Sequence, residues 1–375
     1  MAGISAPPVM LRIDPAMRAS GWMVVLVLLA PFAPGAPARA ADELTVPPRL
    51  RLLVVAPHPD DESLGAGGLM QQTLAGGGRV HVLFMTNGDG YPEAVEIATG
   101  HREPSASDYR GFGELRRAEA LVALEHYRVL PLSVTFLGFP DGGLAEIWRR
   151  GPQVPAYESP YTREDNPPYP HAFEASARYV SRDLIHLIAR MVALSDPDWI
   201  ALPTPLDNHP DHCATFTFVL AALKSLAAEA GGASKVPDRV LTYLVHGSAG
   251  WPPPSSVPGP IPVPSQGLEP ARWYSLALTP DQVKTKLEAL ETHRTQAAVM
   301  DALFRSFARS NELFDVVERD QMLHMVPGTP PCGPELPSRA SLPPRTVDPA
   351  AHAGAAPAQI APTPESQSST KGHAP

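Results

Sequence analysis

Apolar runs and amphipathic stretches alternate along most of this chain. The first apolar run, 52–56, is followed by a helical stretch at 65–75 and by a second apolar run at 79–86. Short runs rich in β-branched and aliphatic residues indicate strands buried on both faces of a parallel sheet. The same patterns predict further strands at 133–137, 199–202, 240–245 and 273–278, and further helices at 114–126, 177–194, 214–228 and 279–298. Alternating strands and helices form βαβ units, so the sequence predicts a single α/β domain with a mostly parallel sheet flanked by helices.

Three stretches show neither pattern. The polar stretch 91–109 and the stretch 152–169, rich in proline and tyrosine, are predicted to be irregular loops beside the sheet. The aromatic side chains of the second loop either line a sugar cleft or pack the loop down; they are Tyr157, Tyr161 and Tyr169. The stretch 328–375 is rich in Pro, Ala, Ser and Thr and predicts a disordered tail.

The first forty residues are typical of an export signal. Two arginines precede the apolar run 22–29, and residues 38–40 have the small-x-small form of a signal-peptidase site. The apolar run is short for a membrane span. Cleavage after Ala40 would leave a periplasmic or secreted protein. Translation of the precursor would start at either Met1 or Met17. The chain is therefore divided into a signal peptide at 1–40, a domain at 41–327 and a tail at 328–375.

The composition limits which classes of partner and of metal site this protein can have. A net charge of −9 and a pI near 5.8 argue against a nucleic-acid partner and favour a neutral or cationic substrate over a polyanion. The chain has only two cysteines, Cys213 and Cys332. This number excludes both a disulfide scaffold and a zinc site built from cysteines.

The first predicted strand ends in a cluster of ionisable side chains. Residues 58–62 read His-Pro-Asp-Asp-Glu and directly follow the run 52–56. The carboxyl ends of parallel strands form the ligand-binding edge of an open α/β sheet. Burying so many charged groups there is costly unless a cation or a substrate engages them. A metal ion is the simplest means of holding His58 and Asp61 together, because their spacing places both on one side of a turn.

A second cluster follows the predicted strand 199–202. Residues 203–212 read PTPLDNHPDH, so His209 and His212 lie three positions apart with Asp211 between them. A single histidine at such a position would more often be structural. Two histidines and an aspartate that face a His-Asp-Asp cluster at another strand end predict a functional site.

Other polar residues follow the remaining strands. Asn87 lies in the sequence TNGDG, which is either a tight turn or a substrate contact. Asp141 follows the third predicted strand and should face the same crevice. Arg116 and Glu119 are three positions apart on a predicted helix, a spacing that most often forms a surface ion pair.

The HPDDE and HPDH motifs together resemble the LmbE/PIG-L family of zinc-dependent N-acetylglucosaminyl deacetylases. The resemblance covers 52–296, and four shorter motifs match in the same order: TNGDG, R-x-x-E, FPDGGL and KLEALETHRTQ. It implies a Rossmann-like fold that binds no dinucleotide, and one zinc ion per chain. The chain departs from the family pattern at 152–169 and 251–270, the regions that would set the substrate.

The resemblance also implies roles for individual residues. His58, Asp61 and His212 would be the metal ligands, and Asp60 would be the general base. His209 would stabilise the oxyanion or act as an acid. The other residues with implied roles are Asp211, which would orient His209, and Arg116 and Asp141, which would contact the sugar. Asn87 is a further candidate for substrate contact, from its position after the second predicted strand.

The chemistry of these residue types agrees with the implied roles. Two imidazoles and one carboxylate leave the fourth position of a tetrahedral zinc ion open, as in catalytic sites. Zinc lowers the pKa of a bound water to about 7. Asp60 can take the proton of that water as it attacks an amide carbonyl, and His209 can stabilise the oxyanion or protonate the leaving amine.

We therefore expect a hydrolase that removes the N-acetyl group from an N-acetylglucosamine-type sugar or glycoconjugate. One alternative is a zinc amidase that acts on another N-acyl or amide substrate. The other is a carbohydrate-binding or metal-storing protein without turnover, which would need neither the base Asp60 nor the group His209. Fe²⁺ is the alternative to Zn²⁺ as the metal.

Overall fold

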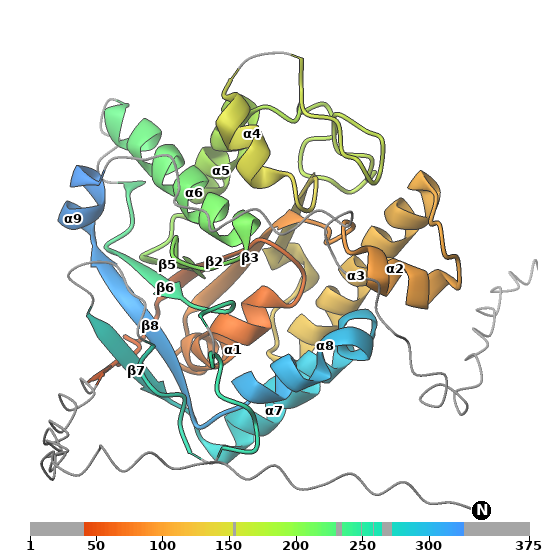
Figure 1. Ribbon diagram of the computed structural model, residues 1–375. Coiled ribbons are helices and arrows are strands. Elements are labelled where there is room, and N and C mark those ends of the chain that lie inside the picture. The colour runs from red at the N-terminus through yellow and green to blue at the C-terminus, as the bar shows by residue number, and fades with distance from the viewer. Residues whose placement is uncertain are drawn as a thin grey trace, which may run out of the picture. The chain divides into compact units, whose positions relative to one another are not determined.

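A mixed β-sheet forms the centre of the protein, with helices on both of its faces (Figure 1). The computed structural model describes residues 41–152, 155–229, 235–248, 250–257, 259–264 and 272–325. The predicted signal peptide and the predicted tail lie outside these residues, so both stay predictions. None of the helices in the described ranges is long and apolar enough to cross a membrane.

The sheet has the strand order β1-β7-β8-β6-β5-β2-β3-β4. Only the β6–β8 and β7–β8 pairs are antiparallel, which confirms the prediction of a mostly parallel sheet. The strands are β1 (Asp42–Glu43), β2 (Arg51–Ala56), β3 (Arg79–Thr86), β4 (Val134–Phe139), β5 (Trp199–Pro203), β6 (Arg239–Tyr243), β7 (Trp273–Ala277) and β8 (Asn311–Glu318).

The two faces of the sheet are covered by different helices. Leu52 and Val54 of β2 pack into one core with α1 and α7, whereas Leu53 and Val55 pack into the other core with α5 and α6. Because alternate side chains enter opposite cores, all of residues 52–56 are apolar. The helices are α1 (Asp61–Ala75), α2 (Pro92–Thr99), α3 (Ala106–His126), α4 (Leu144–Arg150), α5 (Ser181–Ser195), α6 (Pro210–Ala228), α7 (Pro280–Thr292), α8 (Arg294–Phe307) and α9 (Arg319–His324), with a 3₁₀ turn at Pro131–Ser133.

Several predictions of local structure were wrong. The polar stretch 91–109 contains α2 and the start of α3, whose N-terminus is capped by Ser105 and Asp108. The single helix expected at 279–298 is two helices that meet at His293. Strand β8 was missed because its sequence carries the acidic residues Glu312 and Asp315, which the fold nevertheless buries. Helix α4 was also missed, whereas the described part of 152–169 is irregular as predicted.

The order of the strands determines where the site lies. Strands β3 and β4 follow β2 on one side, and the chain then crosses back so that β5 pairs with the other side of β2. Ligands bind outside the carboxyl ends of the strands at such a switch point. The HPDDE and HPDH motifs follow β2 and β5, so the fold brings them together there.

Candidate metal and active site

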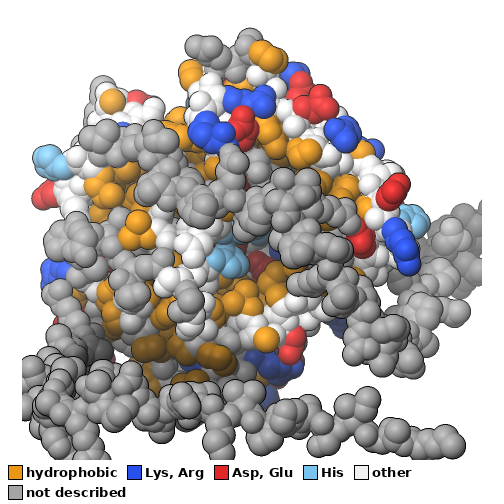
Figure 2. Space-filling view, viewed as in Figure 1, with side chains coloured by type: hydrophobic (Ala, Val, Ile, Leu, Met, Phe, Trp, Pro, Cys, Tyr) orange, Lys and Arg blue, Asp and Glu red, His pale blue; other side chains and the backbone are white. Residues whose placement is uncertain are grey.

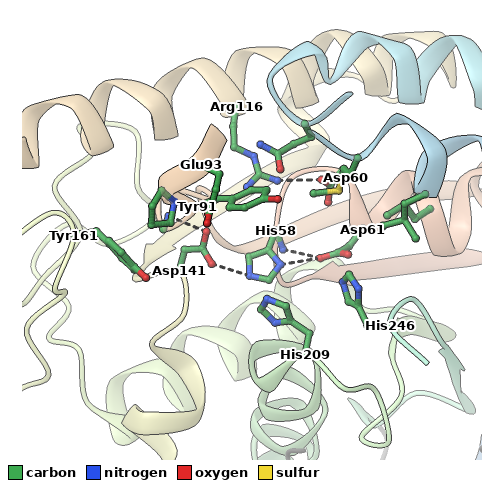
Figure 3. A pocket seen from close by; sticks show the side chains of 16 residues that line it. His58, Asp60, Asp61, Tyr91, Glu93, Arg116, Asp141, Tyr161, His209 and His246 are labelled. Carbon is green, nitrogen blue, oxygen red and sulfur yellow. Dashed lines mark hydrogen bonds and ion pairs between the residues drawn. The ribbon is translucent and has the colours of Figure 1, made fainter. Parts of the chain in front are cut away.

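A cavity of about 490 Å³ opens at the carboxyl ends of the parallel strands (Figure 3). His58 and Asp61 from the end of β2 lie at its floor, and His209 comes from the end of β5. Asp141 follows β4 and His246 follows β6. Residues from four strand ends therefore meet in one cavity. In the space-filling view, a histidine and acidic side chains are visible in a recess of the described surface (Figure 2).

His58, Asp61 and His212 bring three possible metal-binding atoms together. Asp61 Oδ2 lies 3.1 Å from His58 Nδ1 and 3.2 Å from His212 Nε2. All three residues are buried. Neither ring nitrogen of His212 makes a hydrogen bond of good geometry with any described residue. Buried imidazole nitrogens without hydrogen bonds and an adjacent carboxylate fit a bound cation.

The outer ring nitrogens of both histidines face carboxylates. His58 Nε2 lies 3.1 Å from Asp141 Oδ1 and 3.3 Å from Asp211 Oδ2, and His212 Nδ1 lies 3.2 Å from Asp207 Oδ2. Histidines that ligate metals almost always direct the other nitrogen to a carboxylate, a carbonyl or water, which fixes the ring orientation. The arrangement leaves His58 Nδ1 and His212 Nε2 directed towards Asp61.

The electrostatics of this group favour a cation. Burial disfavours the charged form of His212, but Asp61 and Asp207 outweigh burial and raise its pKa to about 10. Burial likewise works against ionised Asp61, but His212 and His58 hold the pKa of that carboxyl well below its usual value. The buried carboxylates thus keep positive charge on the imidazoles, and a divalent cation would replace those protons.

Asp60 adjoins this group without being part of it. Its backbone has a φ of 128°, a strained value for a residue other than glycine, and its N–H donates to Glu62 Oε2 over 2.9 Å. The carboxylate accepts from Arg116 over 3.1 Å. Burial is the largest cause that raises the pKa of Asp60 to about 7, with Asp61 adding to it and Arg116 opposing it. Asp60 also lines the cavity. It is a buried carboxyl group whose pKa suits proton transfer near neutral pH.

His209 is held as a neutral imidazole. Its Nδ1 accepts the backbone N–H of Asp211 over 3.2 Å, so the proton of the neutral ring is on Nε2. Burial, with His58 and His212 adding to it, lowers the pKa of His209 well below its usual value. Asp211 contacts His209 through its backbone N–H, whereas its carboxylate accepts from Gly142 and Leu144 and faces His58. This geometry leaves the Nε2–H of His209 available as a hydrogen-bond donor.

Arg116 is buried, so its interpretation as part of a surface ion pair is wrong. Its guanidinium donates to the carbonyls of Gly88 and Pro59 over 2.9 and 2.6 Å, besides contacting Asp60. Gly88 has a φ of 69°, and a Cβ there would clash with the guanidinium of Arg116. Both facts explain why the first glycine of TNGDG has no side chain. Glu119 instead accepts from Thr295.

Of the other two residues expected to contact substrate, one lines the cavity and one does not. Asp141 lines the cavity and also accepts the backbone N–H of Gly90 over 2.8 Å. Asn87 is fully buried, with its Nδ2 3.4 Å from His171 Nε2, and it does not line the cavity. Asn87 was expected to form either a tight turn or a substrate contact, and its position outside the cavity favours the tight turn.

Two residues of the site were not predicted. Asp207 accepts from the backbone N–H groups of His209, Val245 and His246, each over 2.9 Å, besides facing His212. The signal was present, since Asp207 lies inside the second motif and His246 directly follows the predicted strand 240–245. Applying the strand-end argument to every strand would have identified both.

The chain is similar to several known proteins. A family model described as "PIG-L: GlcNAc-PI de-N-acetylase" matches residues 53–223. A protein of Tsukamurella paurometabola named 1D-myo-inositol 2-acetamido-2-deoxy-alpha-D-glucopyranoside deacetylase is 27% identical over 305 residues, covering 76% of this chain and 95% of that protein. A protein of Rhodococcus opacus with the same name is 32% identical over 194 residues, covering 50% of this chain and 56% of that protein. A solved structure of N,N'-diacetylchitobiose deacetylase from Pyrococcus horikoshii is 18% identical, covers 72% of this chain and 84% of that chain, and has a TM-score of 0.45.

Proposed function

Residues 53–223 match the PIG-L family model, and on this premise we propose that the chain is a metal-dependent N-deacetylase. Its substrate is an N-acetylglucosamine-type amino sugar or glycoconjugate. The observation that carries the proposal is the position of Asp61 between His58 and His212, with Asp60 and His209 beside this group. The names of the relatives support the substrate class.

We further propose that His58, Asp61 and His212 hold one zinc ion, with Fe²⁺ as the alternative. Two imidazoles and one carboxylate form the donor set of hydrolytic zinc sites. The cation, when bound, would polarise the acetamide carbonyl and acidify a water molecule. Asp141, Asp207 and Asp211 would fix the orientation of the two imidazole rings.

The remaining chemistry belongs to Asp60 and His209. Asp60 accepts a proton from the attacking water as the oxygen of that water bonds to the amide carbon. His209 Nε2–H donates a hydrogen bond to the developing oxyanion. When the C–N bond breaks, Asp60 returns the proton to the nitrogen, so that the amine leaves neutral. The other product is acetic acid, which ionises to acetate in solution.

Asp207 should act on metal affinity through His212. Asp207→Asn keeps the size of the side chain but weakens the interaction with His212 Nδ1, and we expect metal affinity to fall about 10–100-fold. Titration with a competing chelator measures this change. Asp183→Asn, on the first turn of α5 and away from the cavity, is the control. Unchanged affinity in Asp207→Asn would exclude the proposed orientation of His212.

Acetate release tests the proposed function. N-Acetylglucosamine and its glycosides should yield acetate and a free amine, and removal of the metal by a chelator should abolish turnover until Zn²⁺ or Fe²⁺ is restored. Faster hydrolysis of unrelated amides would favour the alternative amidase. Binding of sugars without turnover by the metal-loaded protein would favour a non-catalytic carbohydrate-binding protein.

A further inference from the structure

The outer wall of the cavity differs in character from its floor. The floor consists of histidines and aspartates, whereas much of the wall is formed by Tyr91, Pro92, Tyr161, Met300 and Leu303. Figure 3 shows Tyr91, Glu93 and Tyr161 together on the side of Asp141, away from His246. We propose, resting on the proposed function above, that this wall selects an uncharged, apolar group attached to the amino sugar and rejects a phosphate there, with Glu93 as a residue that determines this specificity.

The apolar part of the wall comes from separate elements. Tyr91 and Pro92 begin α2, Met300 and Leu303 belong to α8, and Tyr161 lies in the irregular segment after α4. Aromatic rings contribute large apolar contact area and carry a polar tip, and methionine adapts to irregular shapes. Such a wall gains free energy by covering an apolar group but cannot replace the hydration of an anion.

The charges that line the cavity are mainly negative. Asp60, Asp61, Asp141 and Glu93 line it, and Arg116 is the only arginine or lysine among the described lining residues. Arg116 already donates to Pro59, Gly88 and Asp60. The charge of a divalent cation would be offset by Asp61 and by the carboxylates that face His58 and His212. The described residues that line the cavity therefore provide no arginine or lysine without such partners for a phosphate.

Glu93 extends this negative charge to the outer wall. It is exposed on the first turn of α2, where the helix dipole would otherwise attract an anion. Burial raises the pKa of Tyr161 to about 12, and Asp141 and Glu93 add to the shift, as expected where negative charge gathers. A phosphate on the substrate would have to approach both carboxylates.

Three substrates separate the possible outcomes: benzyl N-acetyl-β-glucosaminide, N-acetylglucosamine and N-acetylglucosamine 1-phosphate. We expect kcat/KM for acetate release to be highest for the benzyl glycoside and lowest for the phosphate, with at least about a tenfold difference between these two. Higher ionic strength should reduce the difference, because it screens the repulsion. Equal or better hydrolysis of the phosphate would overturn the proposal.

Charge variants of Glu93 test its part in the selection. Glu93→Lys should raise the ratio of kcat/KM for the phosphate to kcat/KM for the benzyl glycoside about tenfold. Glu125→Lys makes the same charge change on an exposed position of α3 away from the cavity and should leave this ratio within about twofold of the wild-type value. Identical effects of the two variants would overturn the assignment of Glu93.

Binding distinguishes failure of this inference from failure of the proposed function. The affinities of the three compounds are measured by calorimetry on the metal-loaded Asp60→Asn protein. If the wild type hydrolyses none of the compounds, the deacetylase proposal fails, while the order of affinities still decides the inference. Tighter binding of the benzyl glycoside than of the phosphate supports it, and the reverse order overturns it.

Discussion

Asp61→Ala should lose most of the bound metal, whereas Asp60→Asn should keep about one metal ion per chain and lose most of the activity. Asp61 Oδ2 lies within 3.2 Å of a nitrogen of both histidines, so its removal deletes one of three proposed ligands. Asp60 contacts Arg116 instead. Asparagine at this position retains size and hydrogen bonding but cannot take a proton, so turnover should fall about 10²–10⁴-fold, the usual contribution of a general base.

Metal analysis and kinetics on the same protein preparations decide this prediction. Asp183→Asn, on the first turn of α5 and away from the cavity, is the control for the removal of one carboxylate. The opposite result would show that the roles of the two carboxylates are reversed. It would consist of an empty site in Asp60→Asn and a filled but slow enzyme in Asp61→Ala.

Lys286→Met should lower the free energy of unfolding by about 3–5 kcal/mol, because it leaves Glu312 as an unpaired buried charge. Lys286 and Glu312 are both buried, with 2.6 Å between Nζ and Oε1. The pair lies at an interruption of α1, where Ala66 has non-helical dihedral angles. Lys286 donates to the carbonyl of Leu64 before the interruption, and Glu312 accepts two backbone N–H groups after it, those of Gly68 and Leu69.

Lys284→Met provides a matched control on the same helix. Lys284 is 75% exposed, and its contact with Glu288 is a surface ion pair, so its loss should change stability by less than about 1 kcal/mol. Urea unfolding followed by circular dichroism measures both variants. Equal stability of the two variants would show that the buried pair does not hold α1. Because α1 begins at Asp61, we also expect Lys286→Met to weaken metal binding.

Much of the candidate site could be predicted because its signals are local. The apolar run at β2 and the HPDDE motif after it are adjacent in sequence, as are β5 and the HPDH motif. The rule that ligands bind at the carboxyl ends of parallel strands then joins the two motifs. Local patterns did not predict the burial of residues whose neighbours in space are distant in sequence. Lys286 and Glu312 look like surface residues in sequence, but each is buried because it neutralises the other.

The α/β class, the strands that carry the site and the residue types of the candidate metal cluster could all be inferred from the sequence. These depend on periodicity and on motifs within a few residues of each other. The partner of each side chain, in contrast, depends on the tertiary structure. Asp211 adjoins His209 along the helix, yet its carboxylate lies 3.3 Å from His58, 153 positions away, because β5 pairs with β2. Charged groups bind whichever opposite charge the packed strands bring within reach, and that proximity is a property of the fold rather than of the local sequence.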